Sequence, residues 1–167
     1  MYVFLDTEFV LGPCVPPQLL SIGMCALDGS EFYRELPAGR VVEFADEFLR
    51  RHVLPQLGRD SGVAMTAEQA AHDLASWLDC VGHHIEVCYD YSLDYDLFEG
   101  LLRLGTGASS ARLLPCHVGY LNEIGEWETV AEACFEDLAS RRGLKRHHAL
   151  ADAIALRAKF VAAHCAR

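Results

Sequence analysis

The chain has 167 residues, 51% hydrophobic and 23% charged, which predicts a single domain spanning 1–167 with a sizeable core. Its formal net charge of −10 excludes a broad surface that coats nucleic acid, but not an enzyme that grips a few phosphates through metal ions. No apolar run approaches the roughly 18 residues that cross a membrane, and the first residues do not resemble a signal peptide. We therefore expect a cytoplasmic protein with no membrane partner.

The seven cysteines follow no recognisable metal or disulfide pattern. No CxxC pair occurs, and most of them lie in apolar segments, where free cysteine behaves as a small hydrophobic residue. One cluster could in principle hold zinc: Cys80, His83, His84 and Cys88. Its spacing matches no standard finger, and the two histidines are better explained as a turn before a strand, so we expect no zinc site.

The first predicted elements in chain order are strands. Residues 2–9 are almost continuously apolar, which is typical of a strand covered on both faces. A stiff, proline-rich loop follows over 12–17, and then a second strand over 18–27. Asp28-Gly29 is a strong hairpin turn into a third strand over 31–36, so these strands predict an antiparallel meander.

The rest of the chain alternates helices and strands. Thr66 and Gln69 have the spacing of a capping box, and apolar residues then share one face of a helix over 67–81. The other predicted elements are a helix over 44–57, a strand over 85–89, a helix that Ser92 can cap, a strand over 111–118, and helices over 127–139 and 149–163. This order predicts an α/β fold with a mixed central sheet flanked by helices.

Asp6 and Glu8 are two carboxylates inside the first predicted strand. Because strand side chains alternate between faces, both point to the same side. Burying two like charges together is costly unless a cation or protons compensate them, and carboxylate oxygens are ligands that Mg²⁺ and Mn²⁺ prefer. The pair therefore indicates a metal site, with an edge strand carrying two solvated acids as the alternative.

Two further acids and a histidine could complete this site. Asp94 falls in the first turn of a helix, where the helix dipole favours an anion, although simple capping explains it equally well. Asp152 lies among small apolar residues at the start of the last helix, and His147 lies five residues earlier. An imidazole titrates near 6.5, so His147 could accept a proton from water; a solvated loop histidine is the alternative.

These residues occur in an order that resembles the DEDDh (DnaQ-like) 3′–5′ exonuclease family, which includes ribonuclease T and oligoribonuclease. Segment 4–9 (FLDTEF) resembles the family's first motif, 89–98 resembles the second, and His147 with Asp152 resembles the third. Residues 20–23 (LSIG) also resemble its second strand. The resemblance spans residues 2–160 and implies a ribonuclease-H-like fold.

The sequence departs from the family at the second motif. The usual histidine-asparagine is replaced by Tyr89 and Asp90, and Asp90 could either add negative charge near the site or substitute for a neighbouring ligand. Asp96 is a rival of Asp94, and His148 is a rival of His147. The apolar pair at 97–98 and the five-residue offset to Asp152 favour Asp94 and His147.

The resemblance implies two-metal-ion hydrolysis of a terminal phosphodiester. Two Mg²⁺ or Mn²⁺ ions would be held by Asp6, Glu8, Asp94 and Asp152, with Asp6 as the bridging ligand. His147 would accept the proton of the attacking water. The product would be a nucleoside 5′-monophosphate.

Several neighbouring residues could contact the substrate. The resemblance implies that Thr7 and Phe9, expected on the opposite strand face or at its end, contact the terminal nucleotide. Tyr91 could stack a base, although packing in the core is an equal alternative. In the basic cluster at 141–146, Arg142 and Arg146 could seat further phosphates, or could simply favour a helix end.

A compact stand-alone domain of this kind most resembles the small bacterial 3′–5′ exoribonucleases. We therefore expect single-stranded nucleic acid as the partner, with RNA favoured, and a homodimer, which is common among small members of the family. One alternative is a DNA-specific, proofreading-type exonuclease. The other is a catalytically dead nucleic-acid-binding module on the same fold.

Overall fold

Five strands form one mixed sheet at the centre of the protein. The computed structural model describes residues 1–12, 16–58, 66–105, 109–123 and 125–165. The strands are β1 (Tyr2–Val10), β2 (Gln18–Ala26), β3 (Glu31–Glu35), β4 (His84–Tyr89) and β5 (Arg112–His117), in the order β3-β2-β1-β4-β5. The first three pair antiparallel, whereas β4 runs parallel to β1 and β5 runs parallel to β4. The predicted meander and mixed sheet are therefore confirmed.

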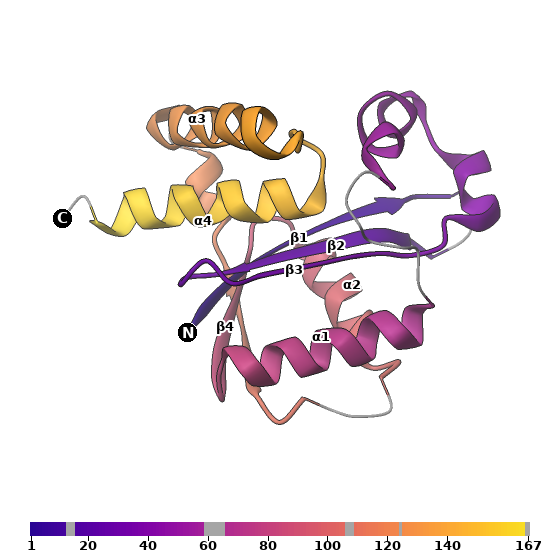
Figure 1. Ribbon diagram of the computed structural model, residues 1–167, viewed down its shortest axis with the longest axis horizontal. Coiled ribbons are helices and arrows are strands. Elements are labelled where there is room, and N and C mark those ends of the chain that lie inside the picture. The colour runs from indigo at the N-terminus through magenta and orange to yellow at the C-terminus, as the bar shows by residue number, and fades with distance from the viewer. Residues whose placement is uncertain (13–15, 59–65, 106–108, 124, 166–167) are drawn as a thin grey trace.

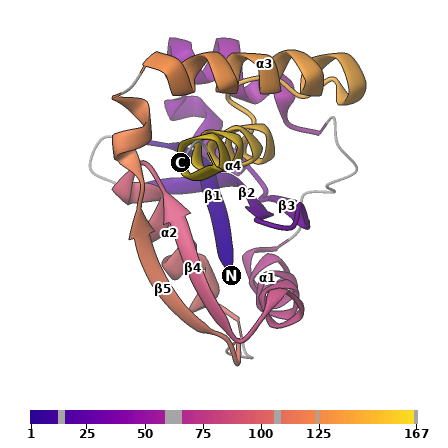
Figure 2. The same cartoon turned by 90° about the vertical axis from the view of Figure 1, so that its left-hand side faces the viewer.

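Helices cover both faces of this sheet (Figures 1 and 2). On one face lie α1 (Ala67–Val81) and α2 (Ser92–Leu102); on the other, α4 (Ala149–Cys165) lies against the strands and α3 (Gly125–Arg142) packs on α4. Shorter helical turns occur at Gly39–Phe44, Leu49–Val53, Leu54–Gln56 and Gly119–Asn122. Among the described residues, no helix combines the length and the apolar character needed to cross a membrane.

The alternation of side chains along β1 explains this two-sided packing. Val3 and Leu5 are fully buried in the core beneath α1 and α2. Phe4 points to the opposite face, where its ring lies 5.1 Å from that of Phe160 on α4. Since both faces of the strand are covered, its sequence is apolar at successive positions rather than at every second one.

The capping box predicted at the start of α1 is present. The Gln69 backbone N–H donates to the Thr66 hydroxyl at 3.3 Å, and the Thr66 backbone N–H donates to the Gln69 side-chain oxygen at 3.1 Å. The helix then buries Ala70, Ala71, Leu74, Ala75 and Leu78. Local capping and apolar periodicity agree here, which is why the sequence predicted this helix correctly.

Four predicted helices differ in detail from those in the structure. The helix expected over 44–57 is a succession of 3₁₀ and π turns, and Pro55, which lacks an N–H, lies among them. Ser92 does not cap α2, because Tyr91 is the N-cap and provides no side-chain hydrogen bond. The last two helices extend beyond their predicted ends, and part of the proline-rich loop, 13–15, lies outside the described residues.

Gly23 on β2 fixes where α4 begins. A Cβ atom at this position would lie 2.2 Å from the backbone nitrogen of Leu150 and 2.3 Å from the carbonyl carbon of Ala149. Only glycine therefore allows the first turn of α4 to contact the strand. Gly23 is also the register partner of Asp6 on β1, so this contact brings the start of α4 beside that carboxylate.

Candidate active site

The acids singled out in the sequence converge on one cavity of about 370 Å³. Asp6 and Glu8 come from β1, Asp94 from the first turn of α2, and Asp152 from the first turn of α4. His147, in the loop before α4, lines the same cavity. We call Asp6, Glu8, Asp94 and Asp152 the acidic floor.

Thr7 and Phe9 also line the cavity, although strand alternation placed them on the opposite face or at the strand end. The Thr7 hydroxyl donates a 2.6 Å hydrogen bond to Asp94, which is only 3% exposed, and so fixes that carboxylate. The β1–β2 register shifts between Glu8 and Phe9. Phe9 is the first β1 residue after this shift, and it reaches the cavity at the end of the strand.

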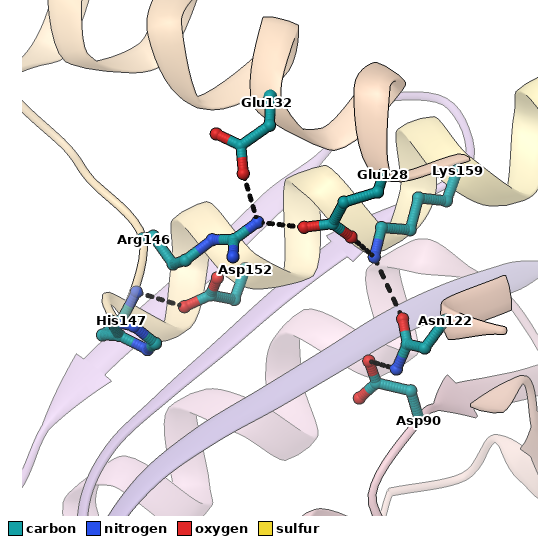
Figure 3. Close-up of polar contacts among 8 residues, drawn as sticks. All are labelled: Asp90, Asn122, Glu128, Glu132, Arg146, His147, Asp152 and Lys159. Carbon is teal, nitrogen blue, oxygen red and sulfur yellow. Dashed lines mark hydrogen bonds and ion pairs between the residues drawn. The ribbon is translucent and has the colours of Figure 1, made fainter. Parts of the chain in front are cut away.

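Asp152 is held by the loop that precedes its own helix. The backbone N–H of His147 donates to the Asp152 carboxylate at 2.7 Å (Figure 3). His147 has a φ of 67°, the only positive φ of a non-glycine residue in the described part of the chain. This left-handed conformation is uncommon for residues with a Cβ, and here it turns the backbone N–H onto the carboxylate.

Asp6 and Glu8 have strongly perturbed acidity. Burial raises the pKa of Asp6 well above its usual range, and repulsion by Asp152, Asp94 and Glu8 adds to the effect. Burial also raises the pKa of Glu8 to about 8, with further contributions from Asp152 and Asp94. In the absence of a cation, both carboxyls therefore retain protons more strongly than exposed acids do.

The pKa values of the other two acids of the floor, Asp94 and Asp152, are also raised. Burial raises the pKa of Asp94 to about 7, against the opposing effect of the Thr7 hydrogen bond. Burial likewise raises the pKa of Asp152 to about 7, although the backbone hydrogen bond from His147 acts to lower it. Four buried acids that resist ionisation together indicate a site arranged for a compensating positive charge.

The ligand atoms form two groups that could hold a metal ion. Glu8, His147 and Asp152 form one group, and Asp6, Asp90 and Asp94 form the other; within each group the ligand atoms lie within 4.8 Å of one another. Asp90, whose role the sequence left open, is therefore within reach of two floor carboxylates. A donor set dominated by carboxylate oxygens suits a hard divalent cation.

His147 has the properties of a neutral base. Burial lowers the pKa of its imidazole, and repulsion by His52 and Arg146 lowers it further. Its ring meets Phe48 edge-on, with 4.7 Å between the ring centroids. The imidazole is thus oriented by apolar contact and favoured in its uncharged form, which can accept a proton or bind a metal.

The two rival residues lie elsewhere. His148 is 2% exposed and stacks on Tyr33, with 4.4 Å between the ring centroids. Asp96 lines a separate cavity, beside Leu97 and Gly100 of α2. The structure therefore brings His147 and Asp94, but neither rival, to the acidic floor.

The predicted substrate-binding residues divide into two sets. Phe9, Tyr91 and Arg146 line the cavity, and the rings of Phe9 and Tyr91 stack with 6.4 Å between centroids. Tyr91 is 56% exposed, so it is not a core residue. Arg142 does not line the cavity, because its guanidinium pairs with Glu31 on β3 at 2.9 Å.

Sequence reasoning missed Gln56, which holds the His147 loop in place. Its side-chain amide donates to the carbonyl oxygens of His52 at 2.8 Å, Arg146 at 2.7 Å and His147 at 2.8 Å. Gln56 is buried and lies about ninety positions from the loop it binds. Because its partners in the His147 loop lie about ninety positions away, no local signal could have identified it.

Sequence reasoning also missed a polar network along one side of the cavity (Figure 3). We call Asn122, Glu128, Arg146 and Lys159 the paired wall. Lys159 donates to Asn122 at 3.0 Å and to Glu128 at 2.9 Å, Arg146 also pairs with Glu128, and Asn122 donates to Asp90 at 2.9 Å. One signal was available: Lys159 lies seven residues after Asp152, a spacing that places both on one face of a helix.

No family model matches this sequence, and no match to a curated protein was found. The resemblance to the DEDDh exonucleases therefore depends on the motifs themselves, and the geometry of the cavity is the independent support for a function.

Proposed function

We propose that the protein is a metal-dependent 3′–5′ exoribonuclease of the DEDDh type. It removes nucleoside 5′-monophosphates from the 3′ end of single-stranded RNA or of 3′ overhangs. The observation that best supports this is the convergence of four acids and His147, from four separate segments, on one cavity. The strand order β3-β2-β1-β4-β5, with helices on both faces, is compatible with a ribonuclease-H-like fold.

The acidic floor would hold the metal ions of this reaction. Asp6, Glu8, Asp94 and Asp152 would bind two Mg²⁺ or Mn²⁺ ions, and Asp90 lies close enough to Asp6 and Asp94 to contribute. Bound divalent ions supply an activated water and neutralise charge on the leaving 3′ oxygen. The carboxyls release their protons on binding, so affinity for the metal increases with pH.

His147 would act as the general base. Its nitrogen lies within 4.8 Å of carboxylate oxygens of Glu8 and Asp152, and burial favours its neutral form. The proton of the attacking water would pass to this nitrogen. Gln56 and Asp152 restrain the backbone of His147 on its two sides, so the imidazole is presented in a fixed position.

The remaining cavity surface suits the end of a single strand. Phe9 and the exposed Tyr91 provide stacked aromatic surfaces on which a base of any identity can pack. The preference for RNA follows from the resemblance to small bacterial exoribonucleases, as does the proposed homodimer. A DNA-specific proofreading-type exonuclease is the second candidate, because the same cavity chemistry serves either polymer.

The experiment that tests the proposal uses 5′-labelled single-stranded RNA and DNA with Mg²⁺ or Mn²⁺. We expect a ladder that shortens from the 3′ end, faster on RNA, and that disappears with chelator or in Asp6→Ala. Faster cleavage of DNA would favour the proofreading-type alternative. Metal binding without cleavage of either polymer would contradict the enzyme proposal and favour a catalytically dead module.

A further inference from the structure

Lys159 is a buried cation inside the cavity. It is 8% exposed, although it lines the same cavity as the acidic floor. Its neighbours on α4, Leu156 and Phe160, belong to an apolar cluster with Phe4 and Leu121. A charged side chain in such surroundings is costly, and well-packed apolar replacements of buried ion pairs are often neutral or stabilising. The positive charge is therefore not needed to form the core.

Lys159 and Arg146 converge on one carboxylate. Glu128 accepts hydrogen bonds from both cations, one through each of its oxygens. Lysine and arginine around a pair of anionic oxygens form the arrangement that also binds phosphate. Glu128 thus occupies the position of an anion between two cations at the cavity wall.

Glu128 is free to leave this position. Its side chain is 46% exposed, and it lies in the first turn of α3, where the helix dipole favours a carboxylate even without an ion pair. The two cations are more constrained: Lys159 is also bound to Asn122, and Arg146 also pairs with Glu132 at 2.7 Å and lies over the ring of Phe135 at 4.9 Å. An arriving phosphate would therefore displace the acid and meet cations already in place.

The position of Lys159 along α4 separates it from the acidic floor. Seven residues of α-helix after Asp152 advance about 10 Å, which is two turns on the same face. Ala155 and Leu156 line the cavity between them. Lys159 therefore contacts a different phosphate from the one held at the floor, and Arg146 lies between the two positions, because its charge also acts on Asp152.

We propose that Lys159 and Arg146 form a phosphate subsite for a phosphodiester of the single strand other than the one cleaved, and that Glu128 occupies this subsite in the free protein. The inference rests on the proposed function, because it assumes that a nucleic acid strand enters the cavity. It assigns a role to two residues, Lys159 and Glu128, that the family motifs do not include.

The test is equilibrium binding of 5′-fluorescein-labelled single-stranded RNA, measured by fluorescence anisotropy in Ca²⁺, with the strand checked for integrity afterwards. We expect Lys159→Met to weaken binding of a pentanucleotide about tenfold and of a dinucleotide, which has one phosphodiester, less than threefold. Loss of one phosphate contact should also reduce the slope of log affinity against log salt by about 0.7. Glu128→Gln should bind the pentanucleotide severalfold more tightly, because the competing charge is gone.

Matched controls come from the Arg34–Asp73 ion pair, which joins β3 to α1 outside the cavity. Arg34→Met and Asp73→Asn should leave binding unchanged. Lys159→Arg, which keeps the charge, should retain most of the affinity, and it serves if Lys159→Met does not fold. An unchanged salt slope in Lys159→Met, or weaker binding in Glu128→Gln, would overturn the subsite. A protein that binds in this pattern but never cleaves would retain the subsite and lose the proposed activity.

Discussion

The acidic floor and the paired wall face the same cavity but compensate their charges differently. In the wall, Glu128 pairs with both Lys159 and Arg146, and Glu132 also pairs with Arg146, so the charges are compensated within the protein. In the floor, none of the four carboxylates takes part in an ion pair among the described residues. Burial instead raises their pKa values. The difference teaches that buried acids without an ion-pair partner form a group that could hold a metal ion.

The largest effect is expected from removing one floor carboxylate. Asp94→Asn should reduce turnover by on the order of 10³-fold, since it removes a charge that acts at the reacting phosphate. Asp96→Asn is the matched control, because the same change two positions away falls in another cavity. The rate at which end-labelled RNA is shortened measures turnover in the two variants. Similar losses in both variants would contradict the assignment of Asp94 to the floor.

A smaller loss of turnover is expected when His147, which lies beside the acidic floor, is replaced. His147→Ala should reduce kcat about 10²-fold, the typical contribution of a general base, while metal binding measured by calorimetry largely remains. His148→Ala should keep kcat and metal binding. It should instead lower the free energy of unfolding by about 2 kcal/mol, because a buried ring stacked on Tyr33 is lost. Equal losses of kcat would show that the roles of the two histidines are not separate.

Replacing Gln56 tests whether catalysis depends on a residue that holds the His147 loop but belongs to neither the acidic floor nor the paired wall. Gln56→Ala should reduce kcat about tenfold with KM little changed, because a loosened loop misplaces the imidazole. Gln69→Ala provides the control: it breaks the capping box of α1 and should cost about 1 kcal/mol of stability without changing kcat. A parallel loss of kcat in Gln69→Ala would mean that general stability, and not positioning, is being measured.

The smallest effect is the pH dependence of stability without metal. In the unfolded chain the floor carboxyls have pKa values of about 4. In the folded protein burial raises the pKa values of Glu8, Asp94 and Asp152 to about 7 to 8. Between about pH 4 and pH 8 the folded state therefore binds more protons than the unfolded state. Their contribution to stability is therefore present below about pH 4 and is lost as pH rises to about 8.

Thermal unfolding measures this contribution. In chelator, wild type should lose several degrees of Tm between pH 5 and pH 8, Asp6→Asn should lose less because one of the four acids is gone, and Mg²⁺ should reverse the wild-type loss. Glu128→Gln, a change in the self-compensated wall, should retain the full pH dependence. A wild-type Tm that does not fall between pH 5 and pH 8 in chelator would show that the floor does not carry uncompensated charge.

The sequence predicted those features that repeat or lie close together along the chain. The alternation within β1 placed Asp6 and Glu8 on one face, and local capping identified α1. Gln56 and the hydrogen bonds of the paired wall escaped prediction, because they join residues that are far apart in sequence. Arg142 and Arg146 show the same limit: α3 ends at Arg142, whose side chain pairs with Glu31 on β3, whereas Arg146 reaches the cavity.

The contact at Gly23 has a consequence for recognising this site in other sequences. A glycine has no functional group, yet its missing Cβ allows the start of α4, and with it Asp152, to approach Asp6. A sequence that keeps all four acids but has a larger residue at this position would contain every ligand and still hold two of them too far apart. The identity of one uncharged strand residue is therefore as informative about an assembled site as the acids themselves.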